Sequence, residues 1–182
     1  MPLTFTIILY AFLGVSLKYI DQAYDEDMFP KRIADVLAII SGIMMGLLMV
    51  YDTPFSTAYF LSLIIATILA GKIDNRAFAI GTFLALSIFF VLSSQQSVVF
   101  LWGVIVILLA VTYLDEVMDE VAHKYKMAMW MRWLLHYRPF TDIAIIVLVC
   151  MGTLSWVSLM PYLTFNTAYR VFSHYTDSSI TN

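Results

Sequence analysis

Long uncharged, apolar segments alternate with short charged ones along the chain. The longest uncharged runs occupy residues 1–17, 36–51, 53–71, 77–114 and 143–169. A helix needs about 20 mainly apolar residues to cross the hydrocarbon layer of a membrane. The run at 77–114 is too long for one crossing, and the polar stretch SSQQS at 93–97 divides it. The pattern therefore predicts six transmembrane helices, at about 4–20, 33–51, 56–72, 77–93, 97–115 and 141–165.

The predicted fold class is an all-α, polytopic integral membrane protein. Lipid offers no water to satisfy open backbone groups, so each crossing segment is expected to be a helix. The six helices group into three hairpins, at 4–51, 56–93 and 97–165, within a single transmembrane domain that spans 1–182. A short segment near 127–137 (MAMWMRWLLHY) has tryptophans at helical spacing and basic residues between them, which predicts an interfacial helix. Residues 166–182 are expected to form a polar C-terminal tail.

The amino-acid composition agrees with a membrane location and limits the classes of molecule that could be binding partners. Apolar residues make up 62% of the chain and charged residues 13%, whereas soluble domains average roughly 45–50% and about 25%. The formal net charge of −3 leaves no basic stripe to neutralise phosphates, so nucleic acid is excluded as a partner. Membrane lipids are the expected partners. A homo-oligomer and a complex with a partner subunit both stay open.

The basic residues indicate an orientation. Cytoplasmic loops of membrane proteins carry an excess of Lys and Arg. Nine of the ten basic residues fall in the first, third and fifth loops between the predicted helices, and the tenth, Arg170, falls in the tail. We therefore expect these three loops to face the cytoplasm and both termini to be extracytoplasmic. The nine residues are Lys18, Lys31, Arg32, Lys72, Arg76, Lys124, Lys126, Arg132 and Arg138.

Acidic residues recur on the same side in a repeated pattern. The motif Y-[IL]-D-x-x-x-D-E occurs at 19–26 and again at 113–120, each time where a predicted helix leaves the membrane. The following predicted helix begins near Asp35 in the first copy and near Asp142 in the second. A fragment of the motif, KIDN, occurs at 72–75. These matches predict an internal repeat of parallel helical hairpins.

The spacing of the repeated acids suggests a metal site. Residues four apart share one face of a helix, so each motif presents two carboxylates side by side. Such close like charges repel unless a cation lies between them. Oxygen ligands suit Mg²⁺ or Mn²⁺, the cofactors we expect here. The predicted metal ligands, gathered around one cytoplasmic cavity, are Asp21, Asp25, Asp74, Asp115 and Asp119.

Basic residues beside these acids are candidates for phosphate binding. Lys18, Lys72 and Arg76 lie at the same predicted helix ends. A divalent ion flanked by such residues can hold a phosphate or diphosphate. The leading hypothesis is therefore a divalent-metal-dependent enzyme that acts on a phosphorylated or isoprenoid lipid. The competing interpretation is that the acids form solvated pairs and that the basic side chains extend to the membrane surface as anchors.

Two known families place Asp clusters at the cytoplasmic ends of membrane helices and use Mg²⁺ on diphosphate substrates. The chain resembles CDP-alcohol phosphotransferases in size and helix number, but it has only D-x-x-x-D and lacks their D-x-x-D-G-x-x-A-R run. It also lacks the N-D-x-x-D motif of UbiA-type prenyltransferases. These are analogies, and no residue roles are carried over. A cation transporter or channel with an acidic cytoplasmic vestibule, and a non-catalytic membrane subunit, remain alternatives.

Overall fold

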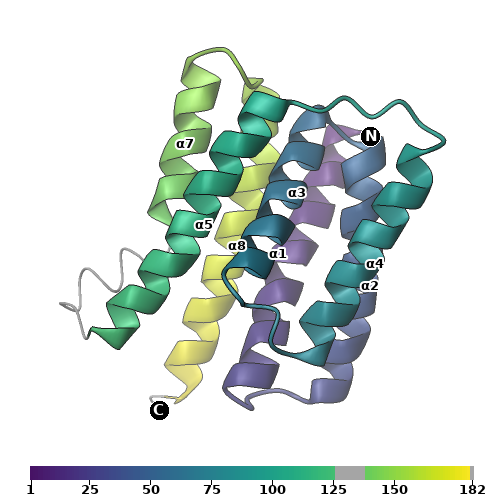
Figure 1. The fold of residues 1–182 in the computed structure, drawn as a ribbon. Helices are drawn as coiled ribbons and strands as arrows, with labels where there is room; N and C mark the ends of the chain where they lie inside the picture. The colour runs from purple at the N-terminus through teal and green to yellow at the C-terminus, as the bar shows by residue number, and fades with distance from the viewer. Residues whose placement is uncertain (126–137, 181–182) are drawn as a thin grey trace. The chain divides into compact units, whose positions relative to one another are not determined.

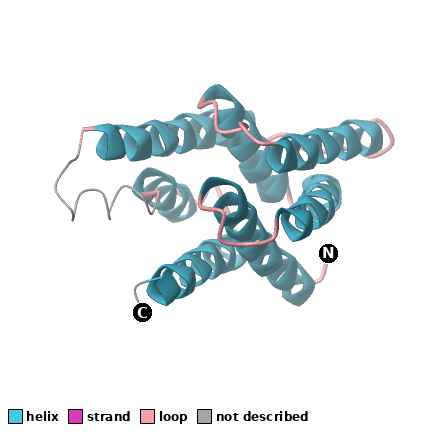
Figure 2. Cartoon of the chain, turned by 90° about the horizontal axis from the view of Figure 1, so that it is seen from below, coloured by secondary structure: helices cyan, strands magenta, loops and turns pink. Residues whose placement is uncertain are grey.

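All regular structure in the described part of the chain is helical (Figure 1, Figure 2). The computed structural model describes residues 1–125 and 138–180. The all-α prediction is confirmed for these residues, whereas the interfacial helix predicted near 127–137 lies outside them. The helices are α1 (Leu3–Asp25), α2 (Lys31–Tyr51), α3 (Pro54–Leu69), α4 (Arg76–Ser93), α5 (Trp102–Lys124), α7 (Pro139–Cys150) and α8 (Trp156–Ile180).

Three of the described helices are long and apolar enough to cross a membrane, namely α1, α2 and α4. They indicate a membrane protein. Helices α3 and α7 are apolar but shorter, with 16 and 12 residues. At a rise of about 1.5 Å per residue, α7 is only about 18 Å long, against roughly 30 Å of hydrocarbon. Six membrane-crossing helices are therefore not confirmed.

The predicted helix at 141–165 is wrong as a single element. Helix α7 ends at Cys150, and α8 begins at Trp156. Gly152 between them has a φ of +72°, and the N–H groups of Gly152 and Thr153 donate back to the carbonyls of Val149 and Leu148. This left-handed cap closes a helix. Helix α8 then continues to Ile180, so residues 166–180, expected as a polar tail, are helical.

The chain divides into two compact units. The first contains Met1–Thr53, Asp74–Val98 and Met160–Asn182, and the second contains Pro54–Ile73 and Val99–Leu159. The first unit therefore holds α1, α2, α4 and most of α8, and the second holds α3, α5 and α7. The middle hairpin predicted at 56–93 contributes one helix to each unit.

Helices α1 and α2 run antiparallel in the first unit. At one end, the Thr6 hydroxyl donates to Asp52 over 2.9 Å. At the other end, the Tyr24 hydroxyl donates to Asp35 over 2.5 Å. The first predicted hairpin is therefore closed by a polar contact at each end.

Helices α2 and α4 run parallel and meet at glycines. A Cβ added at Gly42 would lie 2.4 Å from the carbonyl oxygen of Gly81, and one at Gly46 would lie 2.8 Å from that of Ala85. Only a residue without a side chain allows backbones to come this close. The order of the contacts, 42 with 81 and 46 with 85, gives the two helices the same direction.

Helices α1 and α8 are also parallel. A Cβ at Gly14 would clash with the carbonyl oxygen of Phe165, and the side-chain amide of Gln22 donates to the Thr176 hydroxyl over 2.6 Å. The start of α1 and the end of α8 therefore lie at opposite ends of this unit.

In the second unit, α5 packs against both α3 and α7. The Ser62 hydroxyl of α3 donates to the carbonyl of Ile105 in α5 over 3.0 Å. The hydroxyls of Thr112 in α5 and Thr141 in α7 lie 3.2 Å apart. Helix α5 is thus the central helix of this unit.

Candidate functional site

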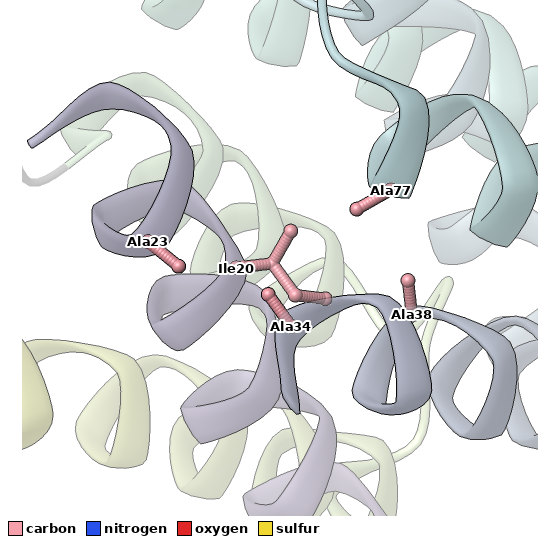
Figure 3. Packing of buried hydrophobic residues seen from close by; sticks show 5 residues of the cluster. All are labelled: Ile20, Ala23, Ala34, Ala38 and Ala77. Carbon is pink, nitrogen blue, oxygen red and sulfur yellow. The ribbon is translucent and has the colours of Figure 1, made fainter. Parts of the chain in front are cut away.

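A small apolar cluster brings together the ends of three helices in the first unit (Figure 3). Ile20 and Ala23 of α1, Ala34 and Ala38 of α2, and Ala77 of α4 are all buried in it. Four of these five side chains are single methyl groups, so the helix ends can approach closely. The charged residues next to the cluster therefore come from three helices and lie at the same end of the unit.

Asp21 is paired with a buried lysine of its own helix. The Lys18 ammonium lies 2.9 Å from Asp21 Oδ2, and its side chain is only 5% exposed, against 32% for Asp21. The same ammonium lies over the ring of Tyr169 in α8, 5.6 Å from the ring centre. Lys18 therefore neutralises a predicted metal ligand and is covered by α8.

Asp25 is the last residue of α1, one turn after Asp21, and Asp74 lies just before α4. Asn75 donates to Asp74 over 3.3 Å and caps α4 by accepting from the N–H of Phe78 over 3.0 Å. Three of the five predicted metal ligands, Asp21, Asp25 and Asp74, thus belong to the first unit.

A second polar cluster, missed by the sequence analysis, links the same three helix ends. Arg76, the first residue of α4, donates to both oxygens of Asp35 in α2 and to the Tyr24 hydroxyl of α1. Tyr24 in turn donates to Asp35. Arg76, predicted as a phosphate contact, therefore has a structural partner, although its side chain is 65% exposed. No spacing rule relates these three residues, because they are joined only by the packing of α1, α2 and α4.

Gln22 is a second residue that sequence reasoning missed. It lies in the first motif, is fully buried, and donates to Thr176 of α8. Its side-chain carbonyl oxygen has no hydrogen-bond partner among the described residues. Residues 173 and 176 of α8 are also buried, so a polar seam joins α1 to the helix that sequence analysis assigned to a tail.

The second motif has a different environment. Asp115 is 1% exposed and accepts three hydrogen bonds from the start of α7. The donors are the N–H of Phe140 at 3.0 Å, the N–H of Thr141 at 2.8 Å and the Thr141 hydroxyl at 2.7 Å. An acidic group that accepts from the first N–H groups of a helix stabilises the helix start. Both oxygens of this predicted metal ligand are therefore already bonded.

The neighbours of Asp115 complete the picture of the second unit. Glu116 is buried and pairs with Arg138 over 2.6 Å. Asp119 is half-buried one turn further along α5 and has an interaction of its own. Lys72, a predicted phosphate contact, is half-buried in the segment after α3. Among residues 1–125 and 138–180, no group of three or more His, Cys, Asp or Glu side chains is arranged to hold a metal ion.

No protein-family model, curated protein or solved structure matches this chain.

Proposed function

We propose that the chain is an integral membrane protein whose N-terminus is extracytoplasmic and whose C-terminus is cytoplasmic. The predicted crossings up to residue 115 are kept, and α8 replaces the single crossing at 141–165, while α7, which is too short to cross, enters the membrane only part of the way. The support comes from the parallel contacts of α1 and α8, since parallel crossing helices end on the same side. Arg170 then joins the other nine basic residues on the cytoplasmic side, as the excess of Lys and Arg there requires.

A short epitope tag placed at either end of the chain tests this orientation. In sealed cells, a protease added from outside should remove an N-terminal tag and leave a C-terminal tag intact. The control is the same digestion after the membrane is permeabilised, when both tags should be lost. Loss of both tags in sealed cells would contradict the proposed topology and restore the arrangement with both termini outside.

We further propose that Asp21, Asp25 and Asp74 bind Mg²⁺ or Mn²⁺, and that the bound ion holds the phosphate of a phosphorylated or isoprenoid lipid on which the protein acts as an enzyme. The observation that carries this proposal is the 2.8 Å hydrogen bond from Arg76 to Tyr24, which brings the start of α4, just after Asp74, to the end of α1, which carries Asp21 and Asp25. Divalent ions are held by carboxylate oxygens and bridge to substrate phosphates. Arg76, in the same unit, is the proposed phosphate contact.

Asp115 and Asp119 are left out of this proposed ligand set. The oxygens of Asp115 accept the three donors at the start of α7, and a metal ion would have to displace them. Buried donors that lose their acceptor cost about 1–3 kcal/mol each. The metal is therefore proposed only at the first motif.

Metal-dependent stabilisation tests the proposal. A ligand that binds only the folded state raises the melting temperature. The purified protein in detergent should melt at a higher temperature in Mn²⁺, and Asp25→Asn should abolish that increase. The matched control is Asp27→Asn, because Asp27 is exposed and forms an ion pair with Lys31. An Asp25→Asn protein that responds to Mn²⁺ as strongly as the wild type would contradict the proposed site.

A second candidate function is a non-catalytic membrane subunit. It is favoured by the pairing of Lys18, Lys31, Arg76 and Arg138 with acids of this chain, and by the absence of a three-ligand group in the described residues. In that case the charged helix ends serve to hold helices together. The thermal experiment separates the two candidates, because the melting temperature of a structural subunit would not change when Mn²⁺ is added. The melting temperature of its Lys18→Met variant would not respond to Mn²⁺ either.

A further inference from the structure

The chain passes between its two compact units at four points. Three of these points lie in the non-helical segments between α2 and α3, between α3 and α4, and between α4 and α5. The fourth lies inside a helix, because Leu159 belongs to the second unit and Met160 to the first, and both are residues of α8. Among the described helices, α8 is therefore the one that belongs to both units.

A proline lies at this point of α8. Pro161, the residue after Met160, is buried inside the helix. A proline fits the first turn of a helix, where its missing N–H would have no partner in any case, but it weakens a helix interior. The other four of the chain's five prolines follow this rule and lie at helix starts, namely Pro2, Pro30, Pro54 and Pro139. Pro161 is the exception, and it lies where α8 changes units.

Two features weaken α8 at this point. Pro161 has no N–H to donate to the carbonyl of Val157, so the two parts of the helix lose one of the hydrogen bonds that would join them. In the next turn, the Thr164 hydroxyl donates to the carbonyl of Met160 over 2.8 Å, and such a bond to the preceding turn often bends a helix. Sharp bends in helices occur at prolines and at inserted side chains of this kind. Helix α8 therefore bends most easily where it passes between the units.

Each part of α8 is tied to its own unit. In the first unit, α8 packs on α1 so closely that a Cβ at Gly14 would clash with the carbonyl oxygen of Phe165. In the second unit, the N–H of Leu154 donates to the carbonyl of Leu148 over 3.1 Å, which fixes the turn between α7 and the start of α8. Bending at Pro161 therefore leaves both attachments intact.

We propose that Pro161 is a hinge at which α8 bends, so that the two units change their orientation relative to one another as rigid bodies. The three non-helical segments between the units accommodate the motion. Hinge motions of this class are absorbed by a few residues at the ends of packed elements, and in many membrane proteins one group of helices moves against another. The inference does not depend on the proposed metal site.

Distances between pairs of spin labels test the hinge. Cys150, the chain's one cysteine, is exposed in α7 of the second unit and carries the first label. Val91→Cys in α4 adds a label in the first unit, and Val106→Cys in α5 adds one in the second. The two valines are matched, with 60% and 63% exposure. Double electron–electron resonance on the protein in lipid nanodiscs gives the distance distribution of each pair.

The pair that joins the two units should have the wider distribution. We expect its width to exceed that of the pair within the second unit by more than about 2 Å, the scale of domain rearrangements. Pro161→Ala restores the missing N–H with a residue that favours helix, so it should narrow the first distribution and leave the second unchanged. Pro30→Ala is the control, because Pro30 lies at a helix start within the first unit, and it should change neither distribution.

Each result decides the inference. Equal widths for the two pairs in the wild type would overturn it, because the units would then move as one body. A wide distribution that Pro161→Ala leaves unchanged would also overturn it, because the motion would then lie in the other three connections. Narrowing by Pro161→Ala, with no change in Pro30→Ala, supports the hinge. The measurement needs no divalent ion, so its outcome is independent of the Mn²⁺ experiment.

Discussion

The two copies of the repeated motif match in sequence but differ in the residues that surround them. Asp21 in the first copy is half-exposed and pairs with Lys18 of its own helix, three residues earlier. Asp115 in the second copy is buried and accepts from the start of the next helix. The residue three positions before Asp115 is Thr112, which lies against Thr141, the residue that caps onto Asp115. The first copy thus has a lysine at this position, and its aspartate is paired with a cation. The second copy has a threonine there, and its aspartate caps a helix.

The position after the repeated aspartate differs in the same way. Gln22 donates to Thr176 of α8, whereas Glu116 pairs with Arg138 just before α7. In each copy, the role of the motif depends on the helix that packs against it, which is α8 for the first copy and α7 for the second. A repeat in sequence therefore does not imply a repeat in chemistry.

The two units also differ in how their helices approach one another. The four glycines of the first unit, at 14, 42, 46 and 81, would each place a Cβ within 3.1 Å of a neighbouring helix. The three of the second unit, at 71, 103 and 152, have no atom within 4 Å of such a Cβ. Close backbone contact is thus a property of the first unit, whereas α5 and α7 in the second are joined by side-chain hydrogen bonds.

The largest expected effect is that of Asp115→Ala. It leaves two buried N–H groups and a hydroxyl without their acceptor, so it should lower the free energy of unfolding by about 3 kcal/mol. Chemical denaturation in detergent measures this change. Asp21→Ala should cost less, because Asp21 is partly exposed and Lys18 retains the nearby carboxylates. Equal losses would mean that the two copies have the same role.

A somewhat smaller effect is expected for Gly42→Ala. The added methyl group would lie 2.4 Å from the carbonyl oxygen of Gly81 and would force α2 and α4 apart. Overpacking of this kind costs typically about 1–3 kcal/mol. Gly103→Ala in α5 is the control and should leave stability unchanged or raise it by up to about 1 kcal/mol, because alanine favours helix. The same denaturation series compares them, and a neutral Gly42→Ala would show that the glycine contact is dispensable.

The smallest effect is expected at the exposed ion pair. Arg76→Met should lower the melting temperature only slightly, and the loss should shrink further at high salt, because the Arg76 side chain is 65% exposed. Arg138→Met removes the partner of a carboxylate that is 7% exposed, so it should lower the melting temperature more and be less sensitive to salt. Melting curves at low and high salt measure both losses. A larger loss in Arg76→Met than in Arg138→Met would contradict the contrast between the exposed and the buried ion pair.

The apolar pattern predicted α2 and α4 closely, because each is bounded by charged or polar residues at both ends. It ends α1 too early, at about residue 20, because charged residues such as Lys18 and Asp21 commonly mark the membrane boundary. The structure continues this helix to Asp25. The polar residues of α8 supply partners that keep the last turns of α1 buried, and hydropathy along one segment carries no information about them.

The candidate site was predictable in part for a similar reason. Spacing predicted that Asp21 and Asp25 share one face of a helix, and both residues lie in α1. The bonds of Asp115 to residues 25 and 26 positions away, and those of Arg76 to Asp35 and Tyr24, depend on which helices pack together. The charge pattern does not mark the turn at Gly152 either, because this residue lies within the uncharged run at 143–169.

The position of α8 within the first unit also sets an order of assembly. Helices α1, α2 and α4 precede α8 in the chain, and α5 and α7 lie between them and α8. Until α8 has been made, Lys18 lacks the ring of Tyr169 and Gln22 lacks the hydroxyl of Thr176. The face of α1 that α8 later covers stays open during this time, and surface exposed in this way favours contacts with other chains during folding. The first unit therefore cannot be completed until α8 has been synthesised.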